Sequence, residues 1–129
     1  MNILARLHAA LIALLLASAA PVAAEQPRGT ELVMIDQKGC AYCEKWEAEI
    51  GPIYPNTAEG AFAPLRRVHI RNSADAIELV RRVNFTPTFL VVRDGREIAR
   101  LEGYPGEDFF WPLLTRMLTE NTEYTGGNG

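Results

Sequence analysis

The chain has 129 residues, a formal net charge of −3, 48% hydrophobic and 22% charged residues, and two cysteines. This length fits one domain, the slightly acidic charge argues against a nucleic-acid-binding protein, and the hydrophobic fraction argues against intrinsic disorder. Two cysteines are too few for a disulfide-rich scaffold, and alone they cannot fill a tetrahedral zinc site.

Residues 1–24 have the pattern of a secretory signal peptide, with a positively charged amino-terminal stretch, a short apolar run and small residues after it. Val22 and Ala24 occupy the −3 and −1 positions of a cleavage site after Ala24, and cleavage after Ala20 is the alternative. The apolar run is shorter than the roughly 20 residues of a membrane span, and an uncleaved anchor is the competing interpretation. We therefore expect a domain over residues 25–129 that works in an oxidising compartment, where paired cysteines can form a disulfide.

The first predicted elements of this domain are a strand and a helix. Leu32–Ile35 is a continuous apolar run, which is typical of a strand buried on both faces of a sheet. A helix is predicted over Cys40–Ile50, and its expected buried stripe consists of Trp46, Ile50, Ile53 and Tyr54. Residues 55–64 are expected to form a loop that leads to a second strand over Leu65–Ile70.

A second helix and a β-hairpin are predicted next. Asn72 or Ser73 can cap a helix over Ala74–Val83, whose buried stripe consists of Ile77, Val80 and Val83. The Asp94-Gly95 turn joins two further strands, Phe89–Arg93 and Arg96–Glu102.

A last helix with a broad apolar stripe is predicted to end the domain. Pro112 fits this helix only in its first turn, because a proline deeper in the helix would kink it. Residues 121–129 are polar and rich in glycine, and we expect them to form a flexible tail. The stripe consists of Phe109, Phe110, Leu113, Leu114, Met117 and Leu118.

This order of elements predicts an α/β fold, β-α-β-α-β-β-α, with its core over about residues 30–119. The first two strands should be parallel and joined by a right-handed helical crossover, and the last two should form an antiparallel hairpin. A four-stranded mixed sheet with helices on both faces would bury every apolar face described above.

Cys40 and Cys43 lie where a buried strand is predicted to lead into a helix. The first N–H groups of a helix lack partners and the helix dipole is positive there, so the pKa of the Cys40 thiol should fall below its ordinary value of about 8.5. We therefore predict that Cys40 is the exposed nucleophile that attacks a substrate disulfide, and that the less exposed Cys43 resolves the mixed disulfide. In the reverse direction the oxidised pair accepts electrons from a dithiol, and the spacing alone does not fix the direction.

Two other interpretations of this pair remain open at the level of the sequence. An inert disulfide would be a poor staple, because closing so short a loop removes little entropy from the unfolded chain. A copper metallochaperone could bind Cu(I) through the two cysteines, with Met34 or His69 as an added ligand.

The residues around the pair resemble the thioredoxin superfamily. The resemblance rests on a strand, on the run from Gly39 to Cys43 at a helix start, and on Thr86-Pro87-Thr88-Phe89 before a β-hairpin, and it covers nearly all of residues 30–119. It implies a thioredoxin fold in which Pro87 is cis and faces the disulfide, and in which the Thr86 backbone pairs with the substrate chain. Tyr42, between the two cysteines, should be exposed and contact the substrate.

Within the superfamily, the predicted signal peptide and the Cys-Ala-Tyr-Cys motif point to exported members. The motif looks like that of periplasmic disulfide isomerases, but the chain is too short for their dimerisation domain. With Trp46 downstream, it is closer to the small SoxS-type periplasmic thioredoxins of sulfur-oxidation clusters.

This resemblance implies a periplasmic thiol-disulfide oxidoreductase that reduces disulfides in a partner protein, such as a sulfur-carrier protein. It implies a monomer with no bound cofactor and no metal, supplied with electrons by a dithiol protein in the membrane. Activity as a disulfide isomerase or as an oxidant is the alternative.

The sequence also departs from the pattern of cytosolic thioredoxins. Gly39 stands where they have a tryptophan, and Met34 stands where they have a buried aspartate, so the proton acceptor for Cys43 stays open among Glu44, Lys45 and water. Residues 103–105 are expected near the rim of the site. Five arginines should form a solvated face that could also steer an acidic partner: Arg66, Arg67, Arg71, Arg81 and Arg82.

Overall fold

The computed structural model describes residues 29–127, so the predicted signal peptide lies outside the described residues. The described chain contains the strands β1 (Thr30–Asp36), β2 (Leu65–His69), β3 (Thr88–Arg93) and β4 (Arg96–Glu102). Its α-helices are α2 (Ala41–Glu49), α3 (Ala58–Phe62), α4 (Ser73–Ala76) and α5 (Glu107–Asn121). Among these helices, none is both long and apolar enough to cross a membrane.

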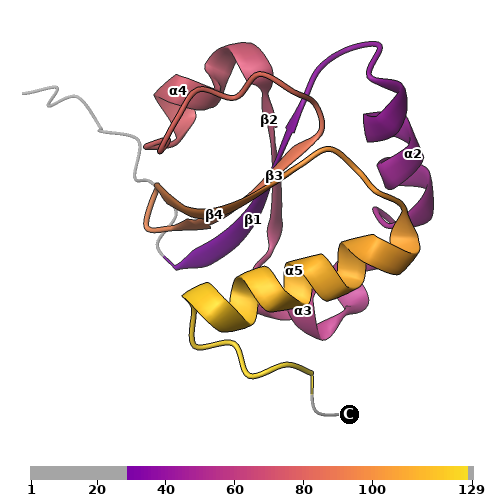
Figure 1. Ribbon diagram of the computed structural model, residues 1–129, viewed down its shortest axis with the longest axis vertical. Helices are drawn as coiled ribbons and strands as arrows, with labels where there is room; N and C mark the ends of the chain where they lie inside the picture. Colours follow the sequence, from indigo (N-terminus) through magenta and orange to yellow (C-terminus); the bar gives the residue numbers. More distant parts are fainter. Residues whose placement is uncertain (1–28, 128–129) are drawn as a thin grey trace, which may run out of the picture.

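The strands form one mixed sheet in the order β2-β1-β3-β4 (Figure 1). β1 and β2 are parallel, whereas β3 is antiparallel to both β1 and β4. The parallel pair and the terminal hairpin confirm the predicted α/β architecture. Leu32–Ile35 lies in an inner strand and is buried on both faces, as its continuous apolar run predicts.

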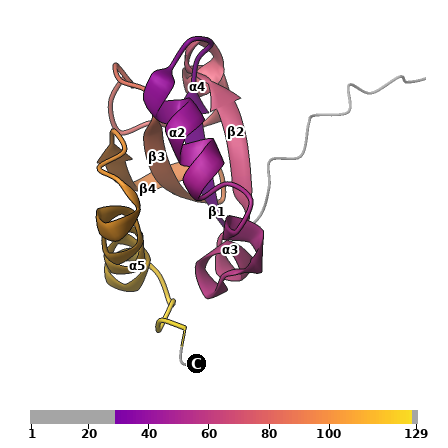
Figure 2. The same ribbon diagram turned by 90° about the vertical axis from the view of Figure 1, so that its right-hand side faces the viewer.

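Alternate residues of the two inner strands point to opposite faces of the sheet and take part in two separate cores. On one face, Leu32 and Phe89 pack with α2, α5 and the segment around α3. On the other face, Val33 and Leu90 pack with α4 and the segment that follows it. Figure 2 shows α2 in front of the sheet, with α3 and α5 toward one end. Helices therefore cover both faces, as predicted.

The first helix follows the prediction, but its expected stripe is only partly buried. Trp46, Ile50 and Tyr54 are fully buried, whereas Ile53 is 45% exposed. The reason is that α2 ends at Glu49, and beyond that residue helical spacing no longer decides which side chains face the core.

The loop predicted over residues 55–64 is wrong in part, because it contains the helix α3. Thr57 caps this helix with its side chain, which accepts a 3.0 Å hydrogen bond from the Gly60 N–H. A Cβ atom at Gly60 would lie 1.9 Å from the carbonyl oxygen of Tyr54, so only glycine fits this close approach. The short helix is thus fixed by a cap and a backbone contact rather than by an apolar stripe.

The helix predicted over Ala74–Val83 is wrong beyond its first turn. α4 ends at Ala76, and the chain then becomes extended. The N–H of Glu78 donates to the carbonyl of Gly95, and its own carbonyl accepts a hydrogen bond from the N–H of Glu97. Backbone groups that a longer helix would satisfy internally are therefore satisfied by the β-hairpin instead.

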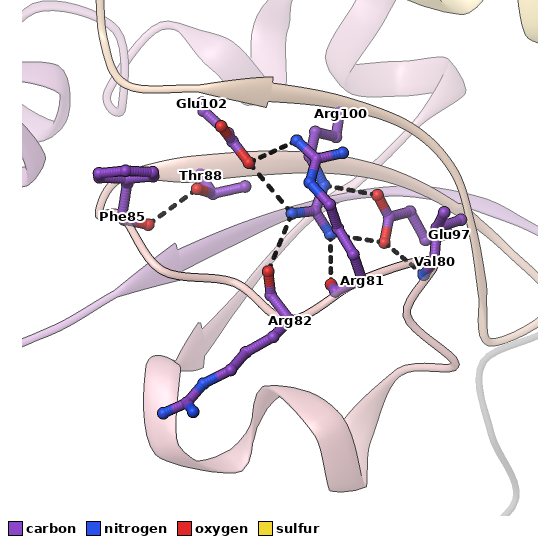
Figure 3. A network of polar contacts seen from close by, with 8 residues as sticks. All are labelled: Val80, Arg81, Arg82, Phe85, Thr88, Glu97, Arg100 and Glu102. Carbon is purple, nitrogen blue, oxygen red and sulfur yellow. Dashed lines mark hydrogen bonds and ion pairs between the residues drawn. The ribbon is translucent and has the colours of Figure 1, made fainter.

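A buried ion pair on β4 holds the rest of this segment (Figure 3). Arg100 and Glu97 bond to each other at 2.6 and 2.8 Å, and both side chains are almost inaccessible to solvent. Glu97 also accepts a 2.9 Å hydrogen bond from the N–H of Val80, and Arg100 donates to the carbonyl oxygens of Arg81 and Arg82. Because β4 rather than a helix fixes this backbone, Val80 is 74% exposed instead of buried.

α5 buries the inner part of its predicted stripe and exposes the first residue of it. Phe110, Leu114 and Leu118 are buried, whereas Phe109 is 65% exposed. Pro112 lies inside the helix, beyond the first turn in which the sequence analysis expected it.

The carboxy-terminal segment, predicted to be a flexible tail over residues 121–129, makes contacts with the domain. The Tyr124 side chain is buried, and its ring centroid lies 5.0 Å from that of Phe62. Glu123 pairs with Arg93. These contacts hold the first part of the segment against the domain, and residues 128–129 lie outside the described residues.

Arg100→Met should lower the free energy of unfolding by about 3–5 kcal/mol, because it leaves the Glu97 carboxylate buried without its partner. Urea denaturation followed by tryptophan fluorescence measures this loss. Arg96→Met is the matched control, since Arg96 pairs with Glu78 on the surface and both side chains are 68% exposed. The control should change the free energy of unfolding by less than about 1 kcal/mol. Equal losses for the two variants would contradict the role assigned to the buried pair.

Candidate active site

Cys40 lies at the amino-terminal end of α2, shortly after β1 ends. Gly39 adopts a φ of 79°, a left-handed conformation that favours glycine, and there the chain turns from the strand into the helix. Cys40 is the capping residue of α2, and its Sγ accepts a 3.2 Å hydrogen bond from the Cys43 N–H. A thiolate formed at Cys40 on reduction would therefore meet a hydrogen-bond donor and the positive end of the helix dipole.

Cys40 and Cys43 form a disulfide, with their Cα atoms 5.2 Å apart. Cys40 is 9% exposed and Cys43 is 6% exposed. The predicted contrast between an exposed nucleophile and a less exposed partner is therefore small in this oxidised form. Both cysteines belong to the core on the α2 face of the sheet.

The Thr86–Pro87 peptide bond is cis and lies at the same edge of the sheet as Cys40. The strand register fixes this position, because Thr88 begins β3 and pairs with Ile35 near the end of β1. Figure 1 shows the start of α2 and the segment that leads into β3 at the same end of the sheet. Pro87 is buried and Thr86 is half-buried. The structure thus brings the cysteine pair and Thr86–Pro87 to one edge.

Two exposed aromatic residues belong to the segments that meet at this edge. Tyr42 lies between the cysteines and is 61% exposed, and Phe85 has the same exposed fraction. The Phe85 carbonyl accepts a 2.8 Å hydrogen bond from the Thr88 hydroxyl, which fixes the turn around Pro87 (Figure 3). Phe85 is not among the site residues predicted from the sequence, although its place directly before Thr86 is a signal for it.

Tyr104 connects the segment after β4 to the end of α2. Its hydroxyl donates a hydrogen bond to Glu49, and its ring packs edge-on against Phe110. Burial, as the larger cause, and the hydrogen bond to the Glu49 carboxylate raise the pKa of Tyr104 above its ordinary value of 10.0. The N–H of the preceding Gly103 donates a 2.7 Å hydrogen bond to the Pro87 carbonyl. Residues 103–105 therefore contact the edge that carries Pro87, where the sequence analysis expects them.

The buried residues that share a core with the disulfide are mainly apolar and aromatic. Met34, which stands where cytosolic thioredoxins have a buried aspartate, is fully buried in this core. Glu44 is exposed, and Lys45 pairs with Glu49 across 3.9 Å. Within residues 29–127, the one hydrogen bond to either sulfur comes from the Cys43 N–H. The structure therefore assigns no side chain as the proton acceptor for Cys43.

The described hydrogen bond of the His69 side chain does not involve the cysteine pair. Its side chain is exposed, and its Nδ1 accepts a 3.2 Å hydrogen bond from the N–H of Arg71. In the part of the chain that the structure describes, no three His, Cys, Asp or Glu side chains gather where they could hold a metal ion.

The free energy of unfolding should fall as the pH rises above about 10, because three buried tyrosines have raised pKa values in the folded state. Burial raises the pKa of Tyr54, Tyr104 and Tyr124, so each loses its proton more readily in the unfolded chain. Deprotonation therefore favours unfolding. Tyr104→Phe should make this alkaline loss smaller, as measured by urea denaturation at a series of pH values around 10. An alkaline loss as large in Tyr104→Phe as in the wild type would contradict the effect assigned to Tyr104.

Comparison with known proteins places this site in a family. Residues 17–118 match the thioredoxin-like domain family. A curated relative, a "Disulfide bond formation protein" of Brevibacillus choshinensis, is 31% identical over 85 residues, which cover 63% of this chain and 67% of that protein.

Two solved structures are also similar to this chain. The periplasmic thioredoxin SoxS of Paracoccus pantotrophus, in its reduced form, is 52% identical with a TM-score of 0.65, and the match covers 68% of this chain and 94% of that one. A thioredoxin of Malassezia sympodialis is 15% identical with a TM-score of 0.51 over 72% of this chain and 78% of that one, which shows the fold alone. The chain therefore belongs to the thioredoxin-like domain family and is a thiol-disulfide oxidoreductase.

Proposed function

We propose that the protein is a periplasmic reductase of disulfides in a partner protein. One observation carries the proposal: Cys40 caps α2, and its Sγ accepts a hydrogen bond from the Cys43 N–H at the same sheet edge as Pro87. The similarity to a protein described as a periplasmic thioredoxin SoxS supports the periplasmic location. The family resemblance of the motif favours the reducing direction. The resemblance to SoxS-type thioredoxins makes a sulfur-carrier protein the candidate partner.

The reaction begins with both cysteines reduced. The Cys40 thiolate attacks one sulfur of the partner's disulfide, forms a mixed disulfide and releases the first partner thiolate, which takes up a proton. The Cys43 thiolate then attacks Cys40 Sγ, and the second partner thiolate leaves. Two electrons have passed to the partner, and the Cys40–Cys43 disulfide remains, as in the structure described above.

The proposal assigns substrate binding to Tyr42, Thr86 and Pro87. Tyr42 is exposed beside the cysteines and offers a ring to the chain that carries the disulfide. The Thr86 backbone would pair with that chain as an added strand does. Pro87 has no N–H to donate and is buried against the edge.

A second dithiol protein must reduce the pair again after each turnover, and a membrane-borne donor fits a periplasmic enzyme. The proposal includes a signal peptide over residues 1–24 and a thioredoxin-like domain over residues 25–129 that acts as a monomer without a bound cofactor or metal. Oxidation of dithiols is the second candidate function, and the similarity to the "Disulfide bond formation protein" favours it.

Cys43→Ser should trap a mixed disulfide between Cys40 and the physiological partner, because the resolving thiol is missing. Cys40→Ser is the matched control and should trap nothing. Non-reducing electrophoresis of periplasmic extracts, followed by mass spectrometry of the trapped band, measures both. Equal trapping by the two variants would contradict the assigned roles.

The reduction potential of the pair should be about −270 mV, the value of a reductant, rather than about −120 mV, the value of a strong oxidant. Equilibration with glutathione redox buffers, followed by alkylation of the free thiols, measures this potential. A value close to that of the oxidant would overturn the proposed reductase function and support the oxidation of dithiols instead.

A further inference from the structure

A groove lies beside the proposed active site, on the α4 face of the sheet. It has a volume of about 710 Å³ and runs between the residues that follow β2 and the segment that precedes Thr86–Pro87. Its apolar lining comes from both walls and includes Ile70, Leu79 and Val83. One wall directly follows β2 and the other precedes β3, both at the edge of the sheet where β1 leads to Cys40. A partner bound at the disulfide can therefore reach the groove.

The charged residues that line this groove are all basic. They are Arg71, Arg81 and Arg82, and none of the described Asp or Glu residues lines it. Arg81 pairs with Glu102, whereas Arg71 and Arg82 make no ion pair within residues 29–127. The chain as a whole carries 16 acidic against 13 basic side chains, so this surface is basic on an acidic protein.

One wall of the groove is held in place before any partner binds. Arg100 donates hydrogen bonds to the carbonyl oxygens of Arg81 and Arg82, and Glu97 accepts one from the N–H of Val80. Figure 3 shows the Arg82 side chain extending away from these contacts. The wall therefore presents a cation on a fixed backbone, which reduces the entropy lost when a partner binds.

We propose that this groove, lined by Ile70, Leu79 and Val83 and rimmed by Arg71 and Arg82, binds an acidic, apolar segment of the disulfide-bearing partner. Apolar side chains of that segment enter the groove, and its carboxylates pair with the two arginines. The inference rests on the proposed function, because it assigns the partner's segment to a surface next to the redox pair. The partner is thereby defined by its chemistry. It carries a stretch of alternating acidic and apolar residues that lies close to the two cysteines of its own disulfide.

The first test uses binding alone and does not depend on redox activity. The probe is a cysteine-free peptide of alternating glutamate and leucine that carries a neutral dye, and a lysine–leucine peptide of equal length is its control. Fluorescence anisotropy at low salt should show tighter binding of the acidic peptide. The double substitution Arg71→Gln with Arg82→Gln should weaken this binding by about tenfold, as loss of two partly exposed charge pairs predicts.

Arg116→Gln is the matched control variant, because Arg116 lies on α5 and is 66% exposed. It should leave the affinity of the acidic peptide unchanged. Equal binding of the two peptides, or equal weakening by Arg116→Gln and the double substitution, would overturn the proposal. Full displacement of the peptide by inorganic sulfate would reduce the groove to a simple anion site and overturn it too. So would a dimer of the wild type that the double substitution abolishes, since a second copy would then fill the groove.

The second test measures reduction of disulfides. Each probe peptide now carries one cysteine and is supplied as its disulfide-linked dimer, with hydroxyethyl disulfide as the small neutral substrate. The wild type should reduce the acidic dimer faster than the basic one, and the double substitution should remove this preference without changing the rate on hydroxyethyl disulfide. If the wild type reduced none of the three substrates, the proposed reductase function would be overturned. The peptide-binding test would still decide whether the groove binds the acidic segment. A preference that survives the double substitution would overturn the inference.

Discussion

The contacts of the Trp46 ring determine where the redox pair lies. Trp46 is fully buried, and its ring centroid lies 5.2 Å from that of Phe89 on β3 and 5.7 Å from that of Phe110 on α5. Large aromatic side chains dominate the burial energy of a core of this size. Trp46 follows Cys43 by less than one turn of α2, so the same contacts fix the orientation of the helix on the sheet and the position of the disulfide at its edge.

Elements with a strong local pattern could be predicted, and elements fixed by distant partners could not. The strand over Leu32–Ile35 and the hairpin at Asp94-Gly95 follow from apolar runs and turn chemistry that lie within a few residues. The spacing of Ile77, Val80 and Val83 is also helical, yet this segment is not a helix. Its hydrogen-bond partners lie on β4, far along the chain, and no local pattern of apolar residues reveals them.

The candidate site shows the same division. The spacing of the cysteines and the Thr86-Pro87 pair are visible in the sequence, because short motifs specify them. The hydrogen bond from Tyr104 to Glu49 and the one from Gly103 to Pro87 depend on the register of β3 with β4 and on how α2 packs. These contacts connect segments that are separated along the chain, so the sequence alone gives only their approximate place in the fold.

The start of the described chain has a consequence for how the domain can be attached to anything else. Gly29 exchanges two hydrogen bonds with Asp94: its N–H donates to the Asp94 carboxylate at 2.8 Å, and its carbonyl accepts from the Asp94 N–H at 3.0 Å. The chain therefore enters the domain beside the β3–β4 turn, and the length of β1, about 20 Å, separates this entry from the disulfide. A surface or fusion partner joined ahead of Gly29 would be linked at the edge opposite the redox pair, which would leave the edge that carries the disulfide open to large partner proteins.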